Sequence, residues 1–509
     1  MRKRSKGFLA AVLALVMLSS CLCVPAFARE IPSSTKVKIN YVVGSNDKSA
    51  EFVYSDALFN QSGYNYRQDL ATMSLAMGLS GGASKTARNA GDMKTMNRNF
   101  RHFADVCGFS KYASNIPMKT RPKIDTVGVN CASKQITDGK GKATLIAVTV
   151  RGFGYQNEWG DNFKVGASGD HLGFSTSRNK VLSFLKDYIR DAGIKGRIKI
   201  WASGYSRGGA ISNLMGGSLD DGYDLGSAVT LDRNDIYIYP AEPALGAVQS
   251  EVRDSKYNNI HNIVNPNDVV CYVGFPAWGF ARYGQDHNTP TKKDPNYAAY
   301  DQTMKEFLRT IPNEIYNVYW PDLFQAWNVT TDGTRITSLT RSDELQPEFY
   351  SDLGQAVTKS FTTSRQDYVD HLQDAMMNLG EIYGREDHKM SEGFGQTAKV
   401  LGDNWQTVFT DLLSGDREQV VNNALKYLHE GFTKAGINNF DEGEFKPVLE
   451  ELVPRAQRMA RAYPSTTATL IANLIPILAC HSAAPCQSWL KTLPTDYMKN
   501  NVTYSYNLK

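Results

Sequence analysis

Between residues 143 and 264 the chain alternates short apolar runs with longer amphipathic segments, and this alternation limits the possible folds more than any other feature. Residues 143–150 (ATLIAVTV) and 197–202 (RIKIWA) are apolar runs typical of strands buried on both faces. Residues 177–192, between them, carry apolar side chains at helical spacing. Further candidate strands are residues 235–239, 260–264 and 278–283. Strands that alternate with helices in this way predict an α/β fold, with a mostly parallel sheet covered by helices on both faces.

The length of 509 residues exceeds that of one ordinary domain. From residue 298 the pattern becomes helical, with apolar residues three and four apart in several segments. We therefore expect four parts: a signal peptide, an α/β core that begins with an irregular lead-in over residues 29–63, a large helical insertion or cap, and a C-terminal segment that returns to the core. Their expected bounds are 1–28, 29–297, 298–465 and 466–509.

The N-terminus is typical of an export signal. A basic start at residues 2–6 precedes an apolar stretch at residues 7–18, and Ala26-Phe27-Ala28 is a small-x-small cleavage site before Arg29. These features predict a secreted, extracellular protein. The segment before Cys21 also resembles a bacterial lipobox, so a membrane-anchored lipoprotein with a lipid on Cys21 is the alternative.

Charge and cysteine content exclude other classes of function. The formal net charge is only +4, and the basic residues cluster nowhere but at the N-terminus, so a nucleic-acid partner is not expected. No paired-cysteine motif indicates a metal site. Cleavage after Ala28 leaves five cysteines, an odd number, so at least one thiol is free. A small disulfide loop between Cys480 and Cys486 is compatible with their spacing.

The segment 204–208 reads Gly-Tyr-Ser-Arg-Gly and places Ser206 between a strand and a helix. Such a G-x-S-x-G elbow forces the serine onto a sharp turn where neighbouring backbone comes close, so the flanking positions must lack side chains. The helix N-terminus behind the serine presents free N–H groups and a partial positive charge, which favours a developing oxyanion. Ser206 is therefore the candidate nucleophile, and the N–H of Arg207 is a candidate oxyanion donor.

The residues around this elbow resemble the class 3 (fungal-type) lipases and their bacterial secreted relatives. The likeness covers about residues 140–290. It lies in Arg151-Gly152-Phe153 after the first strand, in the Trp159 segment, in His171-Leu172-Gly173-Phe174, and in residues 237–243, 262–268 and 278–280. The resemblance implies the α/β-hydrolase fold. It also implies that the backbone N–H of Phe153 completes the oxyanion hole, although the family commonly has Ser or Thr there.

The acid and the base should follow the nucleophile in the order Ser, Asp, His. Asp268 follows an apolar strand and the turn Pro266-Asn267, and the family carries its acid in a similar Asn-x-x-Asp-x-Val context. For the base, we favour His481, because it follows an apolar run near the end of the chain, as a return to the core after the helical segment requires. The alternatives are His287, which follows the last candidate strand, and His388.

Together these residues predict a secreted serine hydrolase that cleaves carboxylic esters through an acyl-enzyme, as esterases and lipases do. The substrate would be a small-molecule or lipid ester, and a lipid substrate would bring transient contact with a lipid surface. The chemistry needs no cofactor or metal, and no obligate protein partner is inferred. The alternatives are a peptidase or carbohydrate esterase that uses the same triad, and a surface or binding protein with a decayed site.

Overall fold

The computed structural model describes most of the chain between residues 29 and 508. The described residues are 29–43, 46–81, 90–115, 127–152, 156–308, 347–383, 389–438, 440–481 and 483–508. The predicted signal peptide and Cys21 therefore lie outside the described residues. Among the described helices, none is both long and apolar enough to cross a membrane.

A mixed five-stranded sheet forms the centre of the molecule. Its strands, in spatial order, are β3 (Lys111–Ser114), β4 (Val129–Asp138), β5 (Gly141–Val150), β6 (Gly196–Gly204) and β7 (Val229–Ile238). The pairs β3–β4 and β4–β5 are antiparallel, whereas β5, β6 and β7 run parallel. The expected strands at 143–150, 197–202 and 235–239 thus lie side by side in the parallel part of the sheet.

The parallel arrangement continues beyond β7 through shorter strands. Isolated parallel bridges connect the end of β7 to β9 (His261–Val264), which pairs in parallel with β11 (Gln285–Asn288). Near the C-terminus, β12 (Val502–Thr503) adds to β11 in antiparallel orientation. The C-terminal segment therefore packs on the core and supplies the edge strand of this short sheet.

The strand expected at residues 278–283 is wrong in extent. A short 3-10 helix occupies Pro276–Trp278, and only Phe280–Ala281 (β10) is extended, paired with β8 (Ala247–Val248). The backbone explains the break, because Gly279 adopts a left-handed φ of 83° that ends any continuous strand. The apolar residues there gave a strand-like pattern without indicating this turn.

Helices cover both faces of the sheet. Because successive strand residues point to opposite sides, each central strand contributes side chains to two apolar cores. Ile146 and Val148 of β5 belong to the apolar core beneath α4 (Leu172–Asp191) and α5 (Arg207–Asp220). Leu145 and Ala147 belong to a second core, on the opposite face. That second core includes apolar residues of α2 (Gln68–Ser80), α3 (Ala90–Val106) and α18 (Ala483–Thr492).

The N-terminal segment is not the irregular lead-in that its polar composition suggested. Strands β1 (Thr35–Val43) and β2 (Asn46–Tyr54) form an antiparallel hairpin. Val37 and Ile39 on β1, and Phe52 and Tyr54 on β2, are buried in the core on the α2 side of the sheet. Their alternation with polar residues is the pattern of a half-buried strand. The hairpin was missed because its outward-facing residues dominate the composition.

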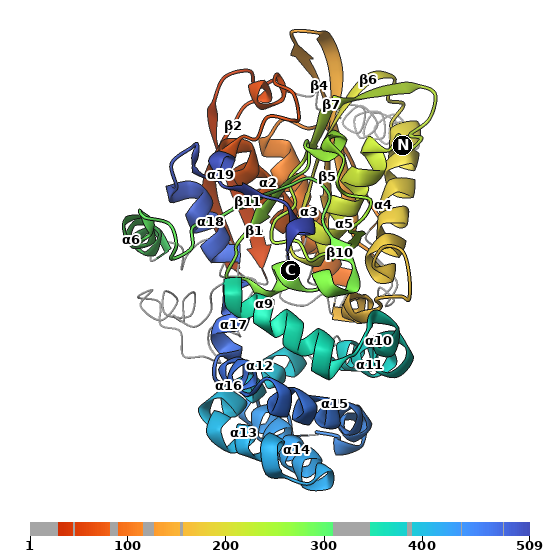
Figure 1. Cartoon of the computed structure of the whole chain (residues 1–509). Helices are drawn as coiled ribbons and strands as arrows, with labels where there is room; N and C mark the ends of the chain where they lie inside the picture. Colours follow the sequence, from red (N-terminus) through yellow and green to blue (C-terminus); the bar gives the residue numbers. More distant parts are fainter. Residues whose placement is uncertain are drawn as a thin grey trace, which may run out of the picture.

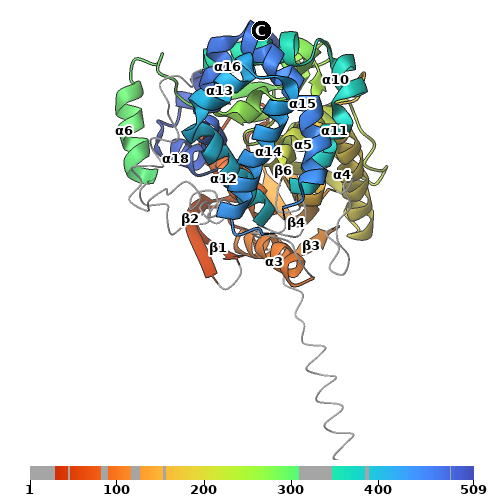
Figure 2. The same ribbon diagram turned by 90° about the horizontal axis from the view of Figure 1, so that it is seen from below.

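Beyond β11 the described chain is helical until α18. The helices are α6 (Tyr297–Leu308), α9 (Pro347–Ala356), α10 (Arg365–His371), α11 (Gln373–Tyr383), α12 (Lys389–Asp403), α13 (Trp405–Ser414), α14 (Arg417–Lys434), α15 (Glu442–Ala462), α16 (Pro464–Ala472) and α17 (Leu474–Cys480), with a π-helical turn at Val357–Phe361. Helices α9 to α17 gather on one side of the sheet-containing core (Figures 1 and 2). They have an apolar core of their own around Phe432 and Phe445.

Specific contacts attach this helical layer to the sheet-containing core. The guanidinium group of Arg365 donates hydrogen bonds to four backbone carbonyls between Val165 and Gly169 and lies over the ring of Phe280. Tyr350 on α9 donates its hydroxyl proton to the carbonyl of Asn267, which precedes Asp268. The helical layer therefore contacts the loop after β9 directly.

This topology confirms the predicted fold class. The sheet has a parallel centre with antiparallel pairs at its edges, helices cover both faces, and a strand–turn–helix at β6 and α5 carries Ser206. This is the arrangement of the α/β-hydrolase fold, here with a large helical layer between β11 and the C-terminal segment.

Candidate functional site

Ser206 sits on the sharp turn between β6 and α5. Its φ of 58° and ψ of −126° are rare for a residue with a side chain. Close backbone packing explains why glycines surround it. A side chain at Gly204 would collide with the backbone of Gly208, and one at Gly208 would collide with the carbonyl of Val150. The turn is held by a hydrogen bond from the Ser206 N–H to the Ala241 carbonyl (2.9 Å).

Three of the predicted side chains form a continuous hydrogen-bonded series. Nε2 of His481 lies 2.7 Å from Oγ of Ser206, and Nδ1 of His481 lies 2.7 Å from Oδ2 of Asp268. Because an ionised carboxylate can only accept, Nδ1 carries the proton, and Nε2 is then free to accept the proton of the serine hydroxyl. Asp268 is fully buried and His481 nearly so, whereas Ser206 is partly exposed.

The position of His481 at the end of α17 is fixed by groups from the core. The hydroxyl of Tyr205 donates a hydrogen bond to the His481 carbonyl, and the two rings stack with their centroids 5.2 Å apart. The side-chain amide of Asn265 donates to the carbonyl of Cys480 (3.2 Å). Tyr205, which precedes the serine, and Asn265, from the loop that carries the aspartate, therefore both hold the segment that carries the histidine.

Asp268 is oriented by its own loop. Its Oδ1 accepts a hydrogen bond from the N–H of Val270 (2.9 Å) at the start of the 3-10 helix Val269–Tyr272, while Oδ2 faces His481. The thiol of Cys271 lies 3.5 Å from the same Oδ2. With one oxygen held by the backbone, the other is presented to the imidazole in a fixed direction.

The candidate oxyanion donors lie beside the elbow. Arg207 is the first residue of α5, so its N–H has no partner within the helix. Gly152, two residues after the end of β5, packs so tightly on the Tyr205 carbonyl that a side chain would collide with it. Phe153, the other expected donor, lies outside the described residues. Within the described residues, the candidate oxyanion hole therefore has one donor, the N–H of Arg207 at the N-terminus of α5.

A buried ionic network braces this side of the site. The side chain of Glu158 pairs with Arg151 (2.5 Å) and with Arg207 (3.2 Å), and Arg207 also contacts Asp161 (3.4 Å) and Ser177. All three acid–base contacts are almost fully shielded from solvent. Burial raises the pKa of Asp161 to about 6, with Arg207 opposing the rise. Arg151 of the Arg-Gly motif, together with Glu158 and Asp161 on either side of Trp159 in the sequence, thus forms a network with Arg207, the residue after the nucleophile.

His287, the alternative base, is not near the serine. It lies within β11, where Nδ1 contacts the carbonyl of Met498 (2.9 Å) and Nε2 contacts Nδ1 of His261 (3.0 Å). Its ring stacks on Tyr66 at 3.9 Å, and burial lowers its pKa to about 4. It is a neutral packing residue, which its position near a strand end did not reveal. His388, the third candidate, lies outside the described residues.

The suggested disulfide is also wrong. Cys480 and Cys486 are both buried thiols, as are Cys107, Cys131 and Cys271. Cys480 ends α17 and Cys486 lies within α18, on the two sides of the turn at His481.

A carboxyl group that the sequence reasoning missed also faces His481. Glu242 follows the end of β7 and is fully buried, with Oε2 3.8 Å from Nδ1 of His481. By distance, Glu242, Asp268 and His481 could ligate one cation. However, Nδ1 needs its proton for the 2.7 Å hydrogen bond to Asp268, and a cation would displace that proton. No sequence motif marks Glu242; its left-handed φ of 46° is visible only in the structure.

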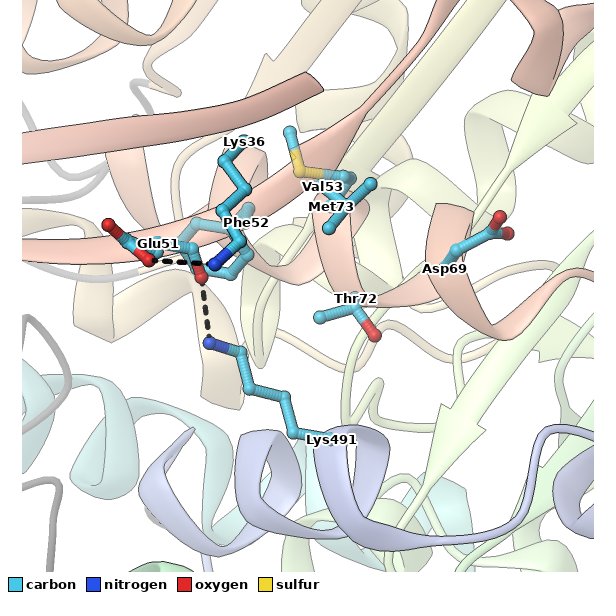
Figure 3. Close-up of a pocket in the computed structure, with 8 residues that line it drawn as sticks. All are labelled: Lys36, Glu51, Phe52, Val53, Asp69, Thr72, Met73 and Lys491. Carbon is cyan, nitrogen blue, oxygen red and sulfur yellow. Dashed lines mark hydrogen bonds and ion pairs between the residues drawn. The ribbon is translucent and has the colours of Figure 1, made fainter. Parts of the chain in front are cut away.

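A separate hollow of about 410 Å³ lies between the β1–β2 hairpin, α2 and α18 (Figure 3). Its charged groups already have partners: Lys36 faces Glu51, Lys491 donates to the Glu51 carbonyl while lying over Phe52, and Asp69 pairs with Arg67 outside the hollow. None of the residues that line it belongs to the Ser206 cluster.

Fold and site together describe an α/β-hydrolase-fold protein in which a serine, a histidine and an aspartate are hydrogen-bonded in series. No protein-family model matches the chain, and no curated protein matches it. Among solved structures, it is similar to a triacylglycerol lipase described as having a serine-protease triad, at 16% identity and TM-score 0.30, over 45% of this chain and 82% of that one. It is also similar to the lipase from Rhizopus microsporus var. chinensis, at 16% identity and TM-score 0.31, over 53% and 81%.

Breaking the buried ionic network should destabilise the protein. We expect Glu158→Gln to lower the free energy of unfolding by about 3–5 kcal/mol, because Arg151 and Arg207 lose their shared buried counter-charge. Urea unfolding followed by circular dichroism measures the change. The matched control is Asp187→Asn, which breaks a solvent-exposed pair with Arg190 and should change stability by less than about 0.5 kcal/mol. Equal losses of unfolding free energy in the two variants would contradict the stabilising role of the buried network.

Proposed function

We propose that the protein hydrolyses carboxylic esters, as an esterase or lipase does, with Ser206 as the nucleophile. The observation that carries the proposal is the series of two 2.7 Å hydrogen bonds from Asp268 through His481 to Ser206. A nucleophile bonded to a base, and a base oriented by a third group, is the arrangement that activates a serine hydroxyl. The strained backbone of Ser206 supports the same role, since strain of this kind clusters at active sites.

In the proposed reaction, Oγ of Ser206 attacks the ester carbonyl while Nε2 of His481 takes its proton. Asp268 keeps the proton of His481 on Nδ1 and stabilises the imidazolium ion that forms. The tetrahedral intermediate collapses as His481 returns the proton to the leaving alcohol, and an acyl-enzyme remains. Water, activated by the same histidine, then attacks the acyl-enzyme and releases the carboxylic acid.

The oxyanion of each tetrahedral intermediate would be bound at the N-terminus of α5. The N–H of Arg207 supplies one donor, and the resemblance at Arg151-Gly152-Phe153 assigns the second to Phe153. Loss of one such donor typically costs on the order of 3–4 kcal/mol of transition-state stabilisation. The buried side chain of Arg207 points into the network with Glu158 and Asp161, so it fixes the start of the helix that presents its own N–H.

The nucleophile and the base should be equally indispensable. We expect Ser206→Ala and His481→Ala each to reduce kcat on a series of nitrophenyl esters by a factor on the order of 10⁴ or more, since triad members act as a unit. Removing the serine oxygen should leave folding intact. The control is His371→Ala, an exposed histidine on α10 that should keep full activity. Retention of wild-type rates by Ser206→Ala would rule out the serine mechanism.

We also propose that the protein is secreted, on the strength of its basic, apolar and small-x-small N-terminal pattern. Mature protein from a secreting host should then begin at Arg29, the first residue after the Ala-Phe-Ala site. Intact-mass spectrometry measures this. A mass that corresponds to cleavage before Cys21, with a diacylglycerol added to it, would instead identify a membrane-anchored lipoprotein.

A further inference from the structure

Glu242 is a buried acid in a strained position. It follows directly after Ala241, whose carbonyl accepts the hydrogen bond from the Ser206 N–H, and its own N–H donates to Ile263 of β9 (2.8 Å). Its side chain is fully buried, and its φ of 46° is unfavourable for a residue other than glycine. Burial of a carboxyl group and left-handed backbone each cost free energy, and such costs concentrate at functional sites.

The carboxyl group of Glu242 faces the nitrogen of His481 that Asp268 binds. Oε2 of Glu242 lies 3.8 Å from Nδ1, and Oδ2 of Asp268 lies 2.7 Å from it. Two carboxyl groups, delivered by the ends of different strands, thus meet at one imidazole nitrogen. A serine hydrolase of this kind needs only one.

The two carboxyl groups differ in protonation. The pKa of Glu242 is raised well above its ordinary value. Burial is the larger cause, and the negative charge of Asp268 is the second. Two carboxylates in one buried site cannot both ionise readily, so Asp268, at hydrogen-bond distance from Nδ1, bears the charge and Glu242 keeps its proton.

The other groups around Glu242 are weak acids without a permanent charge. The Tyr205 hydroxyl and the Cys486 thiol lie close enough to lower its pKa, and the thiol of Cys271 lies beyond Asp268. Besides His481, the titratable groups that face Glu242 are thus Asp268, Tyr205, Cys271 and Cys486. The carboxylate of Asp268 is the charge that opposes ionisation of Glu242.

We propose that Glu242 is a second acid of the site, a positioning residue whose carboxyl group orients His481 in place of Asp268 when the carboxylate of Asp268 is absent. This inference rests on the proposed function. Without Asp268, Glu242 releases its proton to solvent at a lower pH than before. Its carboxylate then accepts the hydrogen bond from Nδ1–H after a movement on the order of 1 Å.

The test compares Asp268→Ala, Glu242→Gln and the double variant, using kcat/KM for a nitrophenyl ester between pH 5 and 9. Asp268→Ala should keep residual activity that rises with pH as Glu242 ionises. Adding Glu242→Gln should lower that residual activity at least tenfold at high pH, and should make its rise with pH correspondingly smaller. Glu242→Gln alone should cost less than tenfold, because Asp268 still orients the histidine.

A second measurement does not depend on ester hydrolysis or on a Glu242 variant. The Nδ1 proton of His481, observed downfield by proton NMR, should be present in wild type, and in Asp268→Ala it should still be present at pH 9, where a carboxylate acceptor is needed to keep it on Nδ1. If wild type hydrolyses no ester but the NMR signal behaves in this way, the proposed function fails while the second acid stands. Identical pH profiles for Asp268→Ala and the double variant, or no Nδ1 resonance in Asp268→Ala at pH 9, would overturn the inference.

Discussion

The hydrogen bond between His481 and Asp268 is the interaction on which the rest of the structure depends. It joins the end of α17 to the loop after β9, across 213 residues of sequence. To make it, the chain must leave the sheet at β11, build the helical layer and come back beside Ser206. The return is secured by the packing of α18 into the core and by the pairing of β12 with β11.

This closure makes the helical layer part of the site and not an appendage. Tyr350 of α9 binds the carbonyl of Asn267, one residue before the aspartate, and stacks on Tyr272. Arg365 of α10 binds the loop that leads from the 3-10 helix Gln156–Phe163 into α4. A change in the packing of these helices would therefore shift the segments that carry the acid and the base, because they are in direct contact.

The elbow and the central strands could be predicted from the sequence because their signals are local. The apolar run of β6, the glycines around Ser206 and the helix after it appear within about twenty residues of sequence. The prediction that His481 lies near Ser206 needed more than local sequence. It used the chain order Ser, Asp, His and the expectation that the chain returns to the core after the helical segment. The structure brings the three side chains together, while their catalytic roles remain a prediction.

Other features could not be predicted because they depend on distant contacts or on backbone angles. The β1–β2 hairpin was hidden by its polar outer face, and the turn at Gly279 by the apolar residues around it. His287 differs from a catalytic base only in its partners, His261 and Met498. Glu242 has no motif at all, since what distinguishes it is its distance from Nδ1 of His481.

The central claim is that the site activates the oxygen of Ser206. The most direct measurement is mass spectrometry of peptides from the native protein after incubation with a fluorophosphonate, which labels an activated serine covalently. The account predicts one adduct per chain, on the peptide that contains Ser206, and no adduct after prior unfolding in urea. A native protein that stays unlabelled, or that is labelled at another residue, would contradict it.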